Sequence, residues 1–210
     1  MTPKKTMQEF WNERYQREEY IYGKDPNEYL KAKLKNLTPG RILFPAEGEG
    51  RNAVHAAKKG WQVSAFDQSE EGRKKALRLA EAEGVEIDYT VSGLQNLSFK
   101  EAQFDAIGFV YAHFPPQQRQ EFFNSAHKYL KEGGKVIFEG FASKHPQYQE
   151  SNPAVGGPKE PEMLFSEEEI KNSFHDLHFL EFFEGEIELE EGAFHKGKGW
   201  VIRFVAEKKK

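Results

Sequence analysis

The chain has 210 residues, and its 30 Lys and Arg against 34 Asp and Glu give a formal net charge of −4 at pH 7. The absence of cysteine excludes a disulfide scaffold, a zinc ribbon and a cysteine nucleophile. The mild acidity argues against broad nucleic-acid binding. No run of about 18 apolar residues predicts a membrane span, and the N-terminus lacks the apolar segment of a signal peptide. We expect a cytoplasmic protein with neither a nucleic-acid partner nor a membrane partner.

Two helices are predicted ahead of the first strand. The first covers residues 6–20, where Thr6 can cap the helix and Glu9 stands three positions later as its capping-box partner. The YGKDP segment then interrupts, because the residue before a proline avoids the helical conformation. A second helix is predicted at 27–37. Residues 1–38 are therefore expected to form a helical cap.

Short apolar segments alternate with amphipathic segments in the rest of the chain, residues 39–210. Strands are predicted at 41–46, 61–67, 85–92, 104–112 and 133–141, and helices at 51–60, 70–84 and 115–131. This alternation is typical of a parallel sheet with helices on both faces. A long polar segment rich in Gly and Pro, residues 142–164, is predicted to be a lid, since loops of this length in compact domains are usually functional or disordered.

The C-terminal part departs from the alternation. After a helix at 166–174, two strands at 178–190 and 199–207 follow each other with only residues 191–198 between them. A parallel crossover needs about a dozen residues or more, so these strands should pair antiparallel. We predict one domain over residues 1–210 with an α/β fold: a Rossmann-like, seven-stranded, mostly parallel sheet that ends in an antiparallel hairpin.

A glycine-rich turn lies between the first predicted strand and the following helix. Gly48 and Gly50 permit a tight turn, and the helix N-terminus offers free N–H donors to a ligand. The second strand ends at Asp67, where a carboxylate can accept both hydroxyls of a ribose. Each feature also has a plain structural interpretation, a strand–helix connection for the glycines and a helix cap for Asp67. Together, and in this order, they favour an adenosine-type cofactor.

Two cofactor classes fit this pattern. Gly48, Gly50 and Ala53 satisfy the dinucleotide pattern G-x-G-x-x-A, so an NAD(P)-dependent oxidoreductase is one candidate. Two features argue against it. Glu47 and Glu49 would repel a pyrophosphate but suit a ligand with an ammonium or sulfonium group, and dinucleotide folds continue with parallel strands rather than a hairpin.

The order strand–EGEGRN–helix–strand–Asp67, followed by FDAIGFVYAHF, GGKVIFEGF and the final hairpin, resembles class I S-adenosylmethionine-dependent methyltransferases from residue 10 to about 208. Within this class, the chain resembles the small-molecule branch that contains the tellurite-resistance methyltransferases. The segments that carry this resemblance are the opening FWNERYQREEYIYGKDPNEYL, HFPPQQR and EGAFHKGK. The thiopurine and halide methyltransferases are more distant relatives. The chain departs from the usual first-strand motif, with Phe44 in place of the acidic residue and Ala46 in place of the first glycine.

The resemblance implies S-adenosyl-L-methionine as cofactor and S-adenosyl-L-homocysteine as product. It implies roles around the methionine end, ribose, adenine and sulfonium for Glu47, Gly48, Glu49, Gly50, Asn52, Asp67, Gln68, Ser69, Leu94, Gln95, Val110 and Tyr111. Trp11 and Tyr15, which share a helix face at spacing i, i+4, could close over the site with Tyr22, or could simply pack.

The expected reaction is methyl transfer to a small-molecule acceptor, such as a chalcogen oxyanion or a thiol. Catalytic candidates are His113 after the fourth strand, His195 and Lys196 in the final hairpin, and Arg14 on the first helix. His could act as a base and Lys or Arg could hold an anion, although each also fits an ordinary surface position. No metal site is predicted, the chain could be a monomer or a homodimer, and a non-catalytic adenosyl-ligand-binding protein is the remaining alternative.

Overall fold

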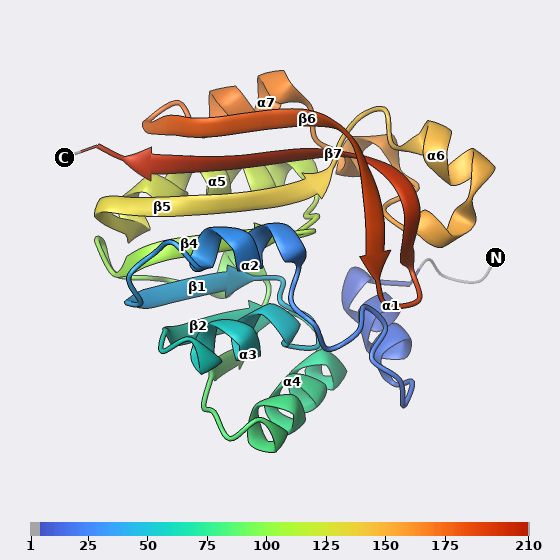
Figure 1. The fold of residues 1–210 in the computed structure, drawn as a ribbon, viewed down its shortest axis with the longest axis horizontal. Coiled ribbons are helices and arrows are strands. Elements are labelled where there is room, and N and C mark those ends of the chain that lie inside the picture. Colours follow the sequence, from blue (N-terminus) through green and yellow to red (C-terminus); the bar gives the residue numbers. More distant parts are fainter. Residues whose placement is uncertain (1–4, 210) are drawn as a thin grey trace.

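The computed structural model describes residues 5–209, and a seven-stranded sheet runs through its centre (Figure 1). The strand order is β3-β2-β1-β4-β5-β7-β6. Five strands run parallel: β1 (Arg41–Pro45), β2 (Gln62–Asp67), β3 (Asp88–Val91), β4 (Phe104–Val110) and β5 (Leu130–Phe141). The last two strands, β6 (Leu177–Glu191) and β7 (His195–Lys208), form an antiparallel hairpin, and β7 pairs antiparallel with β5. The predicted fold class is thus confirmed.

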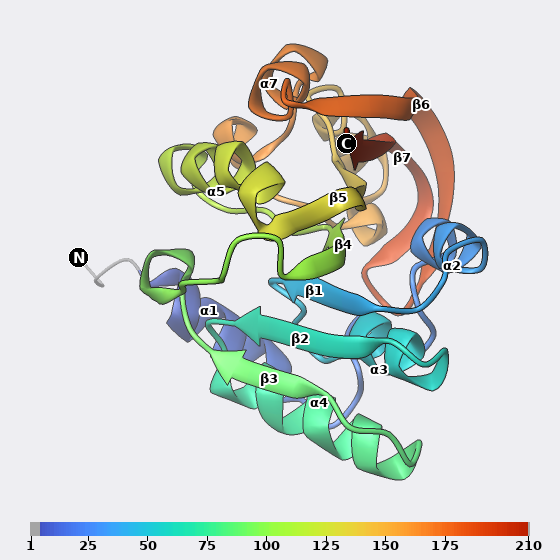
Figure 2. The same cartoon turned by 90° about the vertical axis from the view of Figure 1, so that its left-hand side faces the viewer.

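Helices cover both faces of the sheet. Figure 2 shows α2 (Glu28–Leu34) and α3 (Arg51–Lys58) on one side and α5 (Pro116–Tyr129) and α7 (Glu167–Ser173) on the other. The first side also carries α4 (Glu70–Ala82), against which α1 (Met7–Tyr15) packs. Within the part of the chain that the structure describes, no helix is both long and apolar enough to cross a membrane.

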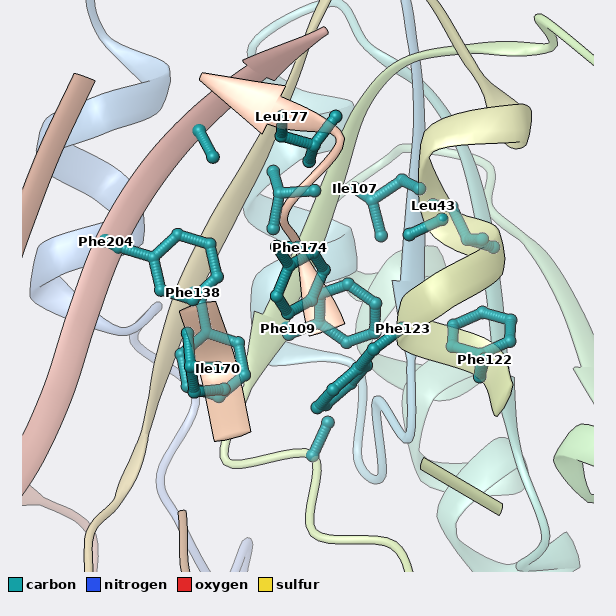
Figure 3. Packing of buried hydrophobic residues seen from close by; sticks show 14 of the residues in the cluster. Leu43, Ile107, Phe109, Phe122, Phe123, Phe138, Ile170, Phe174, Leu177 and Phe204 are labelled. Carbon is teal, nitrogen blue, oxygen red and sulfur yellow. The ribbon is translucent and has the colours of Figure 1, made fainter. Parts of the chain in front are cut away.

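Phenylalanines fill the core between the sheet and the pair α5 and α7 (Figure 3). Phe138 on β5 and Phe204 on β7 are register partners, and their rings stack with centroids 4.9 Å apart. Phe109 on β4 meets Phe123 on α5 edge-to-face at 5.0 Å. Such pairs contribute about 0.5–1.5 kcal/mol beyond area burial, so aromatic packing fixes the angle between helices and sheet.

The first helix has the predicted start but an earlier end. Thr6 accepts a hydrogen bond from the Glu9 amide, and the Glu9 carboxylate accepts one from the Thr6 amide, which confirms the capping box. The helix stops at Tyr15 instead of residue 20. Beyond it, the Tyr20 hydroxyl donates to the carbonyl of Lys75 and the Ile21 amide donates to Glu49. Contacts to the glycine turn and α4 therefore override the local helix propensity.

The polar segment 142–164 folds into short helices, α6 (Pro146–Ser151), η2 (Pro153–Val155) and η3 (Pro161–Met163). His145 anchors it, since its Nε2 lies 2.9 Å from the carbonyl oxygen of Gly156 and its Nδ1 accepts from the Trp200 amide at 3.2 Å. Val155 is fully buried against Phe141 and the hairpin. The segment is thus packed onto β6 and β7, and its role as a lid stays a prediction.

The final hairpin is longer than predicted and curves over towards α1 (Figure 1). Its strands pair up to Glu191 opposite His195, so the link consists of residues 192–194 rather than 191–198. Gly192 has φ +61°, and a Cβ there would stand 2.6 Å from the Cα of Tyr22. The hairpin tip therefore rests directly on the chain that follows α1.

Candidate functional site

The glycine turn between β1 and α3 forms the centre of the candidate site. Gly48 and Gly50 have φ of +62° and +87°, which favours glycine. A Cβ on Gly50 would stand 2.5 Å from the Cβ of Ala76, so this glycine allows α4 to pack closely. A Cβ on Gly48 would stand 2.5 Å from the hydroxyl of Tyr15, which places α1 directly over the turn. Ala46 also has a left-handed φ, +51°, where the usual motif has glycine.

The two carboxylates of the turn have partners within the protein. Glu47 accepts from the amides of Asn52 and Ala53 at 2.8 and 2.7 Å and so caps α3. Burial raises the pKa of Glu47 to about 7. Glu49 accepts from the Ile21 amide at 2.8 Å and from the ammonium of buried Lys75 at 2.6 Å. The sequence pattern did not predict that these side chains anchor α3, α4 and the chain after α1.

Asp67 ends β2, and its carboxylate accepts hydrogen bonds from the turn on either side, while its role toward a ribose stays a prediction. One carboxylate oxygen accepts from the Gly48 amide at 3.1 Å, and the other accepts from the Ser69 amide at 2.8 Å. Ser69 itself caps α4 through its hydroxyl, which accepts from Gly72. Because a carboxylate offers about four acceptor positions, Asp67 keeps capacity for the two hydroxyls of a ribose. Burial raises the pKa of Asp67 to about 6.

Helix α1 is fastened across the end of β2. Asn12 accepts from the hydroxyl of Ser69 at 2.8 Å, and Gln8 donates to the carbonyl oxygen of Gln68 at 3.0 Å. Trp11 stacks on Tyr15 with ring centroids 5.3 Å apart. The cap thus lies over the predicted cofactor region. Asn12 was missed by the sequence analysis, because a single Asn within a helix carries no distinctive pattern.

The ends of the next strands complete this edge of the sheet. Leu94 and Gln95 lie in η1 (Leu94–Asn96), shortly after β3. Val110 ends β4 with its side chain in the core on the α2 and α3 side. Tyr111 follows with φ +51°, a strained conformation of the kind that clusters at functional sites. Its hydroxyl donates to the buried carboxylate of Glu139.

His195 lies beside Tyr111 at the start of β7 and is 97% buried, with 3% of its surface exposed. Its ring centroid is 4.4 Å from that of Tyr111 and 4.6 Å from that of Tyr22. Its Nδ1 lies 3.3 Å from the carboxylate of Glu191, and none of residues 5–209 forms a hydrogen bond with its Nε2. Lys196, the next residue, is exposed and faces the opposite side of the strand.

Glu191 is held in its ionised form. Burial works against this, but His195 and Arg51 together lower the pKa of Glu191 to about 2. The pKa of His195 is itself lowered, because burial outweighs the carboxylate. The sequence analysis identified His195 and missed Glu191. Strand β6 contains several glutamates, and the sequence pattern does not show that the carboxylate of Glu191 turns inward.

His113 has a different environment. Its Nδ1 lies 2.8 Å from the carbonyl oxygen of Met163, its Nε2 accepts from the Phe141 amide at 3.4 Å, and its ring lies between Phe141 and Phe165. Burial lowers the pKa of His113 to about 3. Both nitrogens are thus occupied, Nδ1 by the 142–164 segment and Nε2 by the end of β5. In the part of the chain that is described, no group of three or more acidic or His side chains is placed to hold a metal ion.

Arg14 on α1 meets the hairpin tip. Its guanidinium lies 4.4 Å from the ring centroid of Phe194 and 5.8 Å from that of Tyr22. Its Nε is buried and has no hydrogen-bond partner among the described residues. The structure therefore brings Arg14 close to the His195 region. Lys196 faces the opposite side of the strand, and Phe141 lies between His113 and His195.

Three comparisons place this geometry in context. Residues 42–134 match the family model described as a methyltransferase domain. No curated protein sequence matches the chain. A protein solved in work on the conversion of a disulfide bond into a thioacetal group during echinomycin biosynthesis superposes with a TM-score of 0.74 and 18% identity, over 97% of this chain and 92% of that one.

Two further solved structures share the fold. TehB from Haemophilus influenzae gives a TM-score of 0.68 with 17% identity, over 96% of this chain and 67% of that one. Magnesium protoporphyrin IX methyltransferase (ChlM) from Synechocystis PCC 6803, with bound S-adenosylhomocysteine, gives 0.63 with 14% identity, over 85% and 78%. At these identities the likenesses concern the fold.

The match over residues 42–134 confirms the enzyme class predicted from the sequence: this segment is a methyltransferase domain. S-adenosylmethionine is the cofactor predicted for it from the sequence. The nicotinamide alternative is set aside.

The described residues fit this cofactor. Asp67 keeps acceptor capacity suited to a ribose, and the aromatic faces of Tyr15, Tyr22 and Tyr111 near buried carboxylates suit a sulfonium cation.

Proposed function

We propose that this enzyme transfers the methyl group of S-adenosylmethionine to a thiol, or a related chalcogen group, of a small molecule, and that His195 takes the acceptor's proton. The observation that carries the proposal is the pairing of His195 with ionised Glu191 among packed aromatic rings at the end of β4. The same pairing orders the imidazole for this task.

The carboxylate of Glu191 selects one tautomer of His195. A proton on Nδ1 is stabilised by the carboxylate 3.3 Å away, so Nε2 carries the lone pair and can accept a proton. Because burial lowers the pKa of His195, the imidazole is neutral at pH 7 and ready to act as a base. This is the arrangement in which a third group orients the base.

Beyond this base, the reaction requires few further groups from the protein. When bound, S-adenosylmethionine supplies a methyl group already activated by its sulfonium. Nε2 of His195 accepts the proton of the acceptor thiol, the acceptor sulfur forms the new bond to the methyl carbon, and the electron pair of the broken bond stays on the cofactor sulfur. Asp67 and the Gly48 backbone would hold the adenosyl group, and the rings of Tyr22, Tyr111 and Phe141 exclude water.

The surroundings of His195 support a soft acceptor. The neighbouring rings are aromatic, and Arg51, a cation on α3, is neutralised by Glu191 at 2.7 Å. A chalcogen oxyanion is already ionised and needs no base. Its methylation would therefore not require the His195–Glu191 pair, whereas methylation of a protonated thiol would. The likeness of fold to TehB still makes selenite and tellurite the right comparison acceptors.

The first test is calorimetric titration with S-adenosylhomocysteine, with NAD as the control. Transfer of labelled methyl groups is then measured with small thiols, matched alcohols, selenite, tellurite and halides. We expect thiols to be the best acceptors. His195→Gln should lower kcat for thiols by about 10²–10⁴-fold, as is usual for loss of a general base, and exposed His175→Gln should not change it.

The acceptor's own pKa separates proton transfer from positioning. A thiol that is ionised at the assay pH should lose much less activity in His195→Gln than one that is protonated. Equal losses with both would contradict the role of His195 as base. Binding of S-adenosylhomocysteine without methyl transfer to any acceptor would favour the non-catalytic alternative.

A further inference from the structure

A groove of about 320 Å³ opens between α1 and the tip of the β6–β7 hairpin. Figure 1 shows this tip curving down to meet α1. The groove is lined by three basic residues, one acidic residue and two aromatic rings: Lys5, Arg14, Arg17, Glu13, Phe10 and Phe194. Its volume lies at the lower end of the range of small-molecule sites, and its lining combines positive charge with flat apolar surface.

Arg14 gives the groove an unsatisfied donor. Its Nε is buried without a hydrogen-bond partner among the described residues, although a buried donor normally has one. The guanidinium stacks on Phe194 at 4.4 Å and lies 5.7 Å from the ring of Phe10. Glu13 does not neutralise it, because that carboxylate pairs with Lys5. Arg14 is therefore a partly exposed cation that stacks on Phe194 and has no carboxylate partner among the described residues, so its guanidinium can pair with a carboxylate-like group.

The groove lies near the proposed base, although its lining does not include His195. Phe194 is the residue before His195, and Tyr22 bridges the two, with its ring 5.8 Å from the Arg14 guanidinium and 4.6 Å from the His195 ring. To reach Nε2 of His195, a molecule with its anionic group at Arg14 would have to extend past Phe194 and the ring of Tyr22.

We propose that this groove binds the methyl acceptor, and that the acceptor is a small organic anion: a flat apolar body with a carboxylate-type group that Arg14 holds. The inference rests on the proposed function, since it assigns the acceptor class to the same site. Arg14 would then select among acceptors, because an uncharged analogue leaves the guanidinium without an anionic partner, and an inorganic anion leaves Phe10 and Phe194 without a partner.

Binding of benzoate, measured by calorimetry with S-adenosylhomocysteine present, tests the groove without any reaction. Benzamide is the uncharged comparison and acetate the comparison without a ring. We expect benzoate to bind at least about tenfold more tightly than either, a difference that one charge-assisted contact or one buried ring can supply. Arg14→Gln should remove this preference, Arg14→Lys should keep part of it, and Arg78→Gln on the exposed face of α4 should leave it intact.

Each result decides one question. Failure of benzoate to bind at millimolar concentration, or equal binding of benzoate and benzamide, overturns the proposal. Loss of S-adenosylhomocysteine affinity in Arg14→Gln with benzoate binding unchanged also overturns it and assigns Arg14 to the cofactor. Benzoate binding that depends on Arg14 supports the groove even if no acceptor is methylated, and in that case the proposed function alone fails.

Discussion

The carboxylate of Glu191 accepts a 2.7 Å hydrogen bond from the guanidinium of Arg51, which lies 140 positions earlier in the chain. Arg51 begins α3 directly after the glycine turn, and Glu191 ends β6 at the hairpin tip. Asn27, the cap of α2, donates to the same carboxylate at 2.8 Å. One buried ion pair therefore ties the helix after central β1 to the hairpin at one edge of the sheet, across the candidate site.

Removing the charge of Glu191 should destabilise the fold. Glu191→Gln leaves Arg51 buried without its counter-charge, and breaking one partner of such a pair costs about 3–5 kcal/mol. Urea unfolding measures the effect, with Glu190→Gln as the matched control because Glu190 is the exposed neighbour on the opposite face. An equal effect of both substitutions would show that the ion pair does not support the fold.

The same ion pair also determines how the stability of the fold should change at acidic pH. The pKa of Glu191 is lowered from 4.5 to about 2 in the folded protein, so its contribution to stability is complete above about pH 5 and is lost as the pH falls towards 2. The stability gap between parent and Glu191→Gln should accordingly shrink below about pH 4. A gap that is constant from pH 7 to pH 3 would contradict the ionised state of Glu191.

Asp67→Ala should weaken binding of S-adenosylhomocysteine by on the order of 1–3 kcal/mol, since the ribose hydroxyls would lose their acceptor. Titration calorimetry measures this, and Asp88→Ala is the control, because Asp88 is an exposed carboxylate at the opposite end of neighbouring β3. If Asp67→Ala binds as tightly as the parent, Asp67 is only the cap-like anchor of Gly48 and Ser69.

The sequence predicted the sheet because local patterns determine it. The alternation of apolar and amphipathic segments, and a link too short for a crossover after residue 190, were enough to predict the strands and the final hairpin. The left-handed turn at Gly48 and the carboxylate at Asp67 were visible for the same reason. These features need only the residues next to them.

The partners of the site residues could not be predicted in this way. Glu49 with Lys75, and Glu191 with Arg51, pair across large sequence separations, and both glutamates stand among other acidic residues. The early end of α1 likewise depends on Glu49 accepting from Ile21. Tertiary contacts decide which of several similar side chains turns inward, and a single sequence does not encode that choice locally.

Because of Glu47, the free energy of unfolding should fall as the pH rises from about 4.5 to 7. Burial raises its pKa from 4.5 to about 7, so the folded protein binds this proton more tightly, and stability declines between about pH 4.5 and 7. In Glu47→Gln the amide oxygen can still accept from Asn52 and Ala53, but it does not titrate. Its unfolding free energy relative to the parent should improve by roughly 2 kcal/mol from pH 5 to pH 8.

Urea unfolding at several pH values checks this prediction. Glu86→Gln is the control, because Glu86 is an exposed carboxylate outside the turn. Parallel pH profiles for Glu47→Gln and the parent would mean that Glu47 is ionised in the folded protein over the whole range.

Ala46 carries a strain that its replacement should relieve. Its φ of +51° lies in the left-handed region, where an L side chain costs about 1–2 kcal/mol, and the related first-strand motif has glycine at this place. Ala46→Gly removes this strain, but part of the stabilisation is lost because glycine also increases the conformational entropy of the unfolded chain. We expect a net stabilisation of about 0.5–1 kcal/mol, or about 1–3 °C in Tm for a chain of this size.

Thermal unfolding measures the change in Tm. Ala32→Gly is the control, and it is expected to change stability in the opposite direction. Ala32 is exposed within α2, so glycine there should cost about 1 kcal/mol. Opposite signs for the two substitutions would show that the conformation at residue 46, rather than a general effect of glycine, limits stability. If Ala46→Gly destabilises as Ala32→Gly does, the half-buried methyl of Ala46 contributes more by packing than its backbone conformation costs.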